Sequence, residues 1–563
     1  MQKNRIRQRL VAERKLILAL LVLLLPALVR KAATSQNNSV VADSKGYLGM
    51  EACSGCHSKI YASYQETAMA RASGRATQEL IPGELDHAPS GVHYRVYAEK
   101  GAAWLNYERP GDPSVRGTRE LLYFIGSGSR GRTYLFSDDG FVFESPINWY
   151  AQKRVWDMAP AYQSARHIPM NLPAAASCLS CHTSNMQTPA IGTENKYGLP
   201  LFAHSGITCE RCHGPGAAHI RLNTPMLNPS KLPASRRQAI CMQCHLEGNI
   251  AIERPGKHLY DFQPGDELSK YVSYFELTDD GRQGFGAFSQ FEALAQSVCK
   301  RKSGDAMTCT SCHDPHSSPN SEEKVSFYRS KCLACHGDKF GVKHHADVPN
   351  CAQCHMPAIN SARIAHTQAT DHRILRLPSV PLQSPAPTST PLLVRFPPDS
   401  AKEDSRDLGL AWTSLAESGM ESAIPQAEEL LQKAIQENPD DSALLSAIGY
   451  FEQKRQRFRD ARSHYQRALE LDPYDNDAAT NLGVIEAQDG HAERAVSLWE
   501  PAFERAPAKS AIGMNLVRVF CTLGQYDKAH AHIVRVLEFN PDLPAANTLA
   551  RYLSADPPRC APP

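Results

Sequence analysis

One pentapeptide, C-x-x-C-H, occurs seven times and constrains this chain more than any other feature. Its seven copies take up 14 of the 17 cysteines, leaving Cys299, Cys521 and Cys560 outside the pattern. We number the copies motif 1 to motif 7 in chain order: Cys53–Cys56–His57, Cys178–Cys181–His182, Cys209–Cys212–His213, Cys241–Cys244–His245, Cys309–Cys312–His313, Cys332–Cys335–His336 and Cys351–Cys354–His355.

The repeated motif indicates covalent attachment of haem c, seven groups in all. Two thiols spaced in this way bond to the two vinyl groups of a haem, and the adjacent histidine becomes the proximal iron ligand. Zinc is the alternative, because C-x-x-C pairs also build zinc ribbons. Histidine is only 22 of 563 residues, and zinc ribbons do not require it after every pair. A histidine after all seven pairs therefore favours haem.

Eleven further histidines between residues 43 and 373 could supply the second axial ligands. His219 and His316 follow their motifs by only six and three residues, too few to wind around a porphyrin. They must therefore bind a neighbouring haem, support a ligand, or lie on the surface. The candidate distal ligands are His219, His316, His372, His87, His93, His167, His204 and His366.

The N-terminus has the layout of a secretory signal. Six basic residues precede the apolar run 16–29, which at about 21 Å is shorter than a bilayer core of about 30 Å. We predict that residues 1–33 are a signal peptide or a signal anchor. The chain is then exported to the periplasm or held at the outer face of the cytoplasmic membrane.

Between the motifs the sequence predicts few regular elements. The region 43–373 is expected to be a seven-haem domain of short helices in which the porphyrins form the core. Alternation at 92–98 and a hairpin signal at Ser137-Asp-Asp-Gly140 predict a small β insertion at about 85–150. We expect loop and helix at 246–298, and an extended linker at 374–400, where seven prolines occur.

The last part of the chain repeats every 34 residues. Pro439, Pro473, Pro507 and Pro541 keep this step, as do alanines, and Gly449 and Gly483 recur at one position. The period and its anchors resemble the tetratricopeptide repeat. The glycine is replaced by Leu415 in the first unit and by Val517 in the fourth. The resemblance implies an α-solenoid at 401–555 that binds a protein partner; packing against the haem domain is the alternative.

Several segments of the first 373 residues resemble multihaem cytochromes c with cytochrome c-552/4-type domains. These are Cys53–Tyr64, Ile125–Tyr134, Ile207–His219, Thr308–His316 and Thr370–His372. The resemblance implies that His219, His316 and His372 are distal ligands of other haems. The predicted fold is therefore mainly α: a haem-packed cytochrome module with a small β insertion, followed by the solenoid.

Two functions are consistent with these features. The first is electron transfer along seven haems, with redox partner proteins docked on the repeats. The second is a multihaem oxidoreductase acting on a small nitrogen or sulfur compound at one open haem. No C-x-x-C-K motif, which marks the catalytic haem of related nitrite reductases, occurs here, and surplus histidines argue against a vacant iron. We therefore expect a carrier with no catalytic residues. The formal charge of +2 gives no support to nucleic-acid binding.

Overall fold

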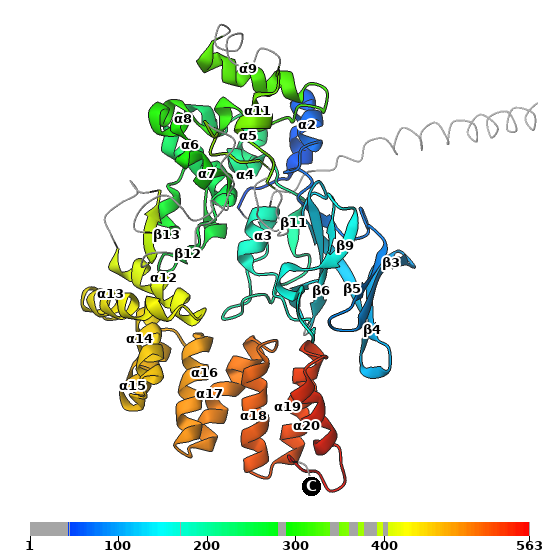
Figure 1. The fold of residues 1–563 in the computed structure, drawn as a ribbon, viewed down its shortest axis with the longest axis vertical. Coiled ribbons are helices and arrows are strands. Elements are labelled where there is room, and N and C mark those ends of the chain that lie inside the picture. The colour runs from blue at the N-terminus through cyan, green and yellow to red at the C-terminus, as the bar shows by residue number, and fades with distance from the viewer. Residues whose placement is uncertain are drawn as a thin grey trace, which may run out of the picture.

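The computed structural model describes residues 43, 45–168, 170–279, 289–337, 348–359, 370–376, 391–397 and 404–561. In Figure 1 an antiparallel sheet and a group of short helices lie side by side above a row of helical repeats. None of the helices in the described part of the chain is long and apolar enough to span a membrane. The predicted signal segment 1–33 lies outside it.

Nine strands form the sheet, in the order β2-β3-β4-β5-β6-β8-β9, with β1 on β5 and β7 on β6. Gly83 on β2 lies against Trp156 on β9, so the sheet curls until its first and last strands meet. The strands are β1 (Ser73–Arg75), β2 (Gly83–His87), β3 (Val92–Glu99), β4 (Ala102–Arg109), β5 (Asp112–Ile125), β6 (Gly131–Asp138), β7 (Phe141–Glu144), β8 (Ile147–Tyr150) and β9 (Val155–Met158).

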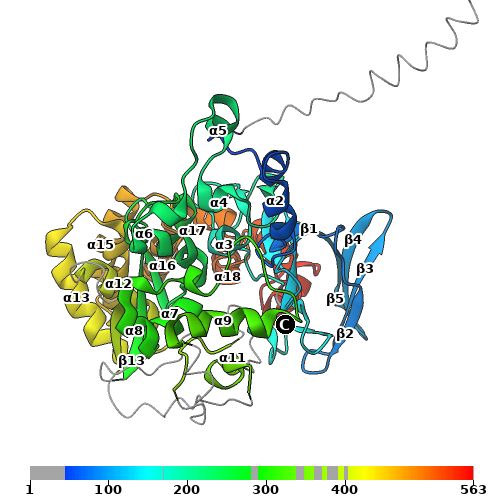
Figure 2. The ribbon, with the colours of Figure 1, turned by 90° about the horizontal axis from the view of Figure 1, so that it is seen from above.

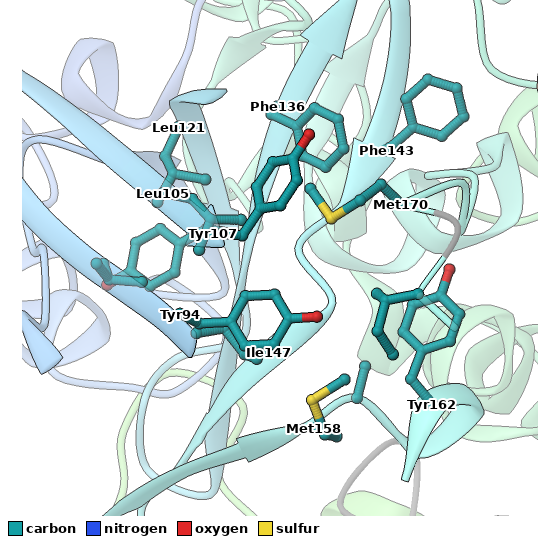
Figure 3. Packing of buried hydrophobic residues seen from close by; sticks show 14 of the residues in the cluster. Tyr94, Leu105, Tyr107, Leu121, Phe136, Phe143, Ile147, Met158, Tyr162 and Met170 are labelled. Atoms are coloured by element: carbon teal, nitrogen blue, oxygen red, sulfur yellow. The ribbon is translucent and has the colours of Figure 1, made fainter. Parts of the chain in front are cut away.

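The predicted alternation and hairpin are confirmed. Val92, Tyr94 and Val96 are buried along β3 and belong to a core that Figure 3 shows filled by aromatic and aliphatic side chains. Asp138 pairs with Phe141 across the turn, and Asp139 and Gly140 both have positive φ, as a type I′ hairpin requires.

The prediction of a small insertion was wrong in extent. The sheet runs from Ser73 to Met158 and has a side-chain core of its own, so the first part of the chain is not mainly α. Short strands such as β1 and β9 have too few alternating positions to be recognised in the sequence.

Short helices surround the motifs. They are α2 (Ser58–Gln65), α3 (Ala176–His182), α4 (Glu210–His213), α5 (Ala217–Leu222), α6 (Ala234–His245), α7 (Gln290–Gln296), α8 (Val298–Ser303), α9 (Lys324–His336) and α11 (Cys351–His355). Single 3₁₀ turns add η1 (Met50–Cys53), η2 (Pro160–Tyr162), η3 (Pro229–Lys231), η4 (Leu259–Asp261), η5 (Leu268–Lys270), η6 (Gly304–Ala306) and η7 (Cys309–Ser311). Strands β10 (Ser184–Met186) and β11 (Phe202–His204) pair with each other.

A second sheet corrects two expectations. Strand β13 (Val272–Asp279) pairs with β12 (Ile250–Glu253) and with β14 (Pro391–Phe396), all antiparallel. The stretch 246–298 therefore holds strands as well as helices. Part of the predicted linker 374–400 is a strand, which its prolines concealed.

The repeats have the predicted period. Helix pairs run from α12 (Ser405–Glu417) and α13 (Ile424–Glu437) through α14 (Ser442–Lys454), α15 (Phe458–Leu471), α16 (Asn476–Gln488), α17 (Ala492–Arg505), α18 (Ser510–Thr522) and α19 (Tyr526–Phe539) to the last helix α20 (Pro544–Leu553), with the 3₁₀ turn η8 (Glu421–Ala423) after α12. A Cβ on Gly449 would come 2.8 Å from the Tyr465 ring, and one on Gly483 would come 2.3 Å from Trp499. In the fourth unit, where Val517 replaces the expected glycine, Gly513 makes the close approach instead.

Both ends of the solenoid are fixed to the cytochrome half. At the last repeat, the buried Asp542 carboxylate pairs with Arg109 of β4 at 2.6 Å, and Phe539 packs edge-on against Phe143 of β7. At the first repeat, the buried Asp407 accepts a hydrogen bond from Ser273 of β13 at 2.6 Å. The row of repeats thus spans the two sheets (Figure 1).

Candidate haem-binding sites

The motifs share one local geometry. Helices α3, α4, α6, α9 and α11 all end at a motif histidine, and in motifs 1 and 5 the histidine N–H bonds to the carbonyl of the first cysteine, as in a helical turn. The two cysteines are therefore three residues apart on one helical face, and the histidine follows directly. This arrangement presents two thiols and an imidazole to the same side.

The chemistry of these groups suits haem c. All fourteen motif cysteines have free thiols, as thioether formation requires, and most are partly exposed. Within the described residues, no three His, Cys, Asp or Glu side chains converge on a position for a metal ion. A structural zinc site needs four such ligands.

Hydrogen bonds orient the proximal histidines. The Nδ1 of His213 bonds to the Leu227 carbonyl at 2.9 Å, and that of His355 bonds to the Leu375 carbonyl at 2.6 Å. Each bond leaves Nε2 for iron, which is the usual arrangement at a ligating imidazole. Burial lowers the pKa of His213 and so favours the neutral form that a metal requires.

Two predicted distal histidines lie close to proximal histidines of motifs 3 and 5, with nearly parallel ring planes. The His213 and His316 ring centroids are 5.9 Å apart with planes 15° apart, and those of His313 and His372 are 6.3 Å and 26° apart. With nitrogen-to-metal bonds of about 2 Å and about 1 Å from nitrogen to ring centre, two imidazoles on one iron have centroids about 6 Å apart. The spacing of both pairs matches that of two axial ligands.

Thiols connect the motifs further. The pKa of Cys53 is raised chiefly by its hydrogen bond with Cys209, and that of Cys241 by its hydrogen bond with Cys309. A hydrogen bond with Cys244 lowers the pKa of Cys181 to about 7. Motifs 1 and 3, 4 and 5, and 2 and 4 are therefore neighbours.

The last two motifs complete the series. Burial, with smaller contributions from the nearby Cys351 and Cys312, raises the pKa of Cys332 to about 11. Motif 6 therefore lies beside motif 7 and within electrostatic range of motif 5. With His316 joining motifs 3 and 5, all seven motifs form one continuous group.

The other distal candidates separate into two sets. His219 lines a cavity of about 340 Å³ together with His213, and its Nδ1 bonds to the Thr224 carbonyl. His204 packs against Gly49, four residues before Cys53. Both lie near motifs 1 and 3.

Three candidates have their partners in the sheet domain or the repeats. Both ring nitrogens of His87 are hydrogen-bonded, to Ser90 and to the Gln163 carbonyl. His93 bonds to Asp86 at 2.7 Å, and His167 lies 3.3 Å from Asp542. These contacts give His87, His93 and His167 structural roles, and the geometry gives no support to distal ligation by them. His366 lies outside the described residues.

A buried acid beside motif 2 was not predicted. Burial raises the pKa of Glu144, on β7, to about 7, and the Cys178 thiol donates to it at 3.9 Å. The sequence places Glu144 in an ordinary strand, and only the fold brings it to the motif.

Comparison with known families places two parts of the cytochrome half. Residues 149–214 match the model for cytochrome c554 and c-prime, and residues 302–341 match the doubled CXXCH motif. Together with the motifs and the 34-residue period, these matches are consistent with a multihaem cytochrome fused to tetratricopeptide repeats. These matches and the motifs indicate that its cofactor is covalently bound haem c.

Similar solved structures cover the repeats of this cytochrome. One is from a study of PilF of Pseudomonas aeruginosa, 17% identical over 26% of this chain and 66% of that chain, with a TM-score of 0.24. A tetratricopeptide repeat protein from Parabacteroides merdae is 19% identical over 27% of this chain and 59% of that chain, with a TM-score of 0.24. YrrB, titled as having an unusual peptide-binding site, is 16% identical over 26% of this chain and 72% of that chain, with a TM-score of 0.23. A search of curated proteins found no match.

Proposed function

We propose that this cytochrome is an exported electron carrier with seven covalently attached haems, and that its repeats dock a redox partner protein. The observation that carries the proposal is the two imidazole pairs, His213 with His316 and His313 with His372, in each of which a motif histidine lies at axial-ligand distance from a histidine outside its own motif. A histidine shared in this way holds neighbouring haems close together, which electron transfer requires.

Each group in the motifs has a defined task in this proposal. The haem supplies a reversible one-electron couple at its iron. The cysteine pairs would hold the haem covalently, the motif histidine would be one iron ligand, and His316 and His372 would supply the second ligand at motifs 3 and 5. Carbonyls such as that of Leu227 hold the ring orientation of the ligands.

The disulfide between Cys521 and Cys560 supports export. It joins α18 to the C-terminal tail with Cα atoms 6.0 Å apart. Disulfides persist in oxidising compartments such as the periplasm, where haem c is also found attached through thioethers. The sequence left this pairing open.

The repeats keep surfaces free for a partner. Their contacts with the sheets use α12, the C-terminal end of α19 and the loop that follows it, whereas Arg518 on α18 and Gln488 on α16 remain exposed. We assign these side chains, which lie on the first helix of their pairs, to the docking face.

Spin state tests the carrier proposal. We expect an oxidised EPR spectrum with low-spin haem only, and no change in the reduced optical spectrum on adding carbon monoxide, because every iron has two protein ligands. A high-spin signal with carbon monoxide binding at one haem would contradict this and indicate the oxidoreductase alternative.

Charge reversal tests docking. Arg518→Glu should slow reduction of the cytochrome by a membrane extract of its source several-fold, because a partner face is sensitive to charge. Lys433→Glu, at an exposed lysine on α13 in the other helix layer, is the matched control. Equal reduction rates for the two variants would contradict the assignment of the docking face.

A further inference from the structure

Glu210 is a buried carboxylate inside motif 3. It follows Cys209 directly and begins α4, yet it is only 1% exposed. Among the described residues, no cation forms an ion pair with it. A charged group is buried at high cost unless hydrogen bonds compensate, so its partners must be strong.

Those partners are three backbone N–H groups, two from a segment distant in the sequence and one from the turn that follows α4. The Leu48 N–H lies 3.0 Å from each carboxylate oxygen, and the Gly49 N–H donates to Oε2 at 2.8 Å. The Gly216 N–H donates to Oε1 at 2.8 Å. Bonds to an ionised acceptor are the stronger kind of protein hydrogen bond.

The donors lie in chain segments that flank two of the haem-binding motifs. Leu48 and Gly49 lead into η1 and Cys53 of motif 1, and Gly216 leads into α5 and His219. Figures 1 and 2 place α2, α4 and α5 next to one another. One carboxylate therefore ties motif 1 to motif 3, although Gly49 and Glu210 are 161 positions apart in the sequence.

Neighbouring contacts reinforce the same junction. Cys53 and Cys209 are hydrogen-bonded, and the Ala217 N–H donates to the Gly46 carbonyl at 3.1 Å. Gly49 has φ +85°, and a Cβ there would come 2.5 Å from the His204 ring. The glycine therefore lets the backbone present its N–H to Glu210 while His204 packs against it.

We propose that Glu210 is a positioning residue that joins motif 1 to motif 3 and whose fixed charge lowers the reduction potentials of the haems attached there. The proposal rests on the proposed haem function, because the potentials belong to the loaded protein. A buried negative charge stabilises the ferric iron over the ferrous iron, since the ferric state carries one more positive charge.

Two variants separate the hydrogen bonds from the charge. Glu210→Gln keeps the size but removes the charge and turns an NH₂ group toward backbone donors. Glu210→Asp keeps the charge but withdraws the oxygens by one methylene. Glu51→Gln is the matched control, because Glu51 is an exposed acid beside the same Cys53.

Hydrogen exchange on the full-length haem protein tests the hydrogen bonds that Glu210 accepts. Both Glu210 variants should raise exchange at Leu48, Gly49 and Gly216 by roughly 10- to 100-fold, the effect of losing a buried charged acceptor. Glu51→Gln should leave these amides unchanged. Wild-type exchange in Glu210→Asp would overturn the positioning role, even if Glu210→Gln fails to mature.

A spectroscopic redox titration tests the effect of the Glu210 charge on the haem reduction potentials. Two of the haem potentials should rise in Glu210→Gln and stay near wild type in Glu210→Asp; unchanged potentials in Glu210→Gln would overturn the electrostatic role. If wild-type protein carries no haem at motifs 1 and 3, the proposed function fails, and the exchange result still decides whether Glu210 positions the two segments.

Discussion

The two regions of this cytochrome are stabilised in different ways. In the repeats, small and aromatic side chains such as Ala461 and Tyr465 are fully buried and form the core themselves. In the motif region, α5, α8, α9 and α11 contain no buried residue. The helices of the repeats pack on each other, whereas these four helices have no buried side chain of their own, as we expect for helices that pack on a haem.

The largest expected effect comes from removing that group at one helix. In Cys332→Ser/Cys335→Ser, α9 loses its haem, and an isolated helix of 13 residues is marginal in water. Hydrogen exchange across 324–336 should rise by about 100-fold or more, with α16 unaffected. Cys299→Ser, the control at a cysteine outside the motifs, should leave exchange in both α9 and α16 unchanged. Full protection of α9 in the double variant would show that this helix does not depend on a haem.

A smaller effect is expected where the solenoid meets the nine-stranded sheet. Asp542→Ala removes the closer of the two carboxylates that pair with Arg109, leaving Asp112, and it removes the acceptor of the Ile168 N–H. Breaking a buried ion pair costs about 3–5 kcal/mol, so the free energy of unfolding should fall by that amount in urea denaturation. Asp527→Ala, at an exposed acid on α19, is the control. An equal loss in both variants would show that the contact between the solenoid and the sheet contributes nothing to the free energy of unfolding.

The smallest effect is expected within the repeats. A Cβ at Gly483 meets Trp499, so Gly483→Ala should destabilise the solenoid by about 1–3 kcal/mol through overpacking. Gly198→Ala, where a Cβ meets nothing within 4 Å, is the control. The haem absorption spectrum should stay unchanged in both. A spectral change in Gly483→Ala alone would mean that the two regions are not independently stabilised.

This contrast explains what the sequence could predict. The 34-residue period can be predicted because the same packing positions recur in every repeat. Pro439, Pro473 and Gly483 are examples of residues at these positions. The haem-binding residues are visible because attachment chemistry demands adjacent thiols and histidine. Both predictions depend on local spacing.

What could not be predicted depends on distant contacts. Strand β14 lies in a proline-rich stretch and forms only by pairing with β13. Glu210 looks like any variable motif residue until the fold brings Leu48 and Gly49 to it. Of the eight distal candidates, only the fold separates His316 and His372 from His87, whose ring is used inside the sheet domain.

The central claim is that all seven motifs carry haem, and the mass of the intact full-length protein tests it most directly. Mass spectrometry, supported by a pyridine haemochrome assay, should give seven covalently bound haems per chain. A value below seven would contradict the account, because the continuous group of motifs would then lack members.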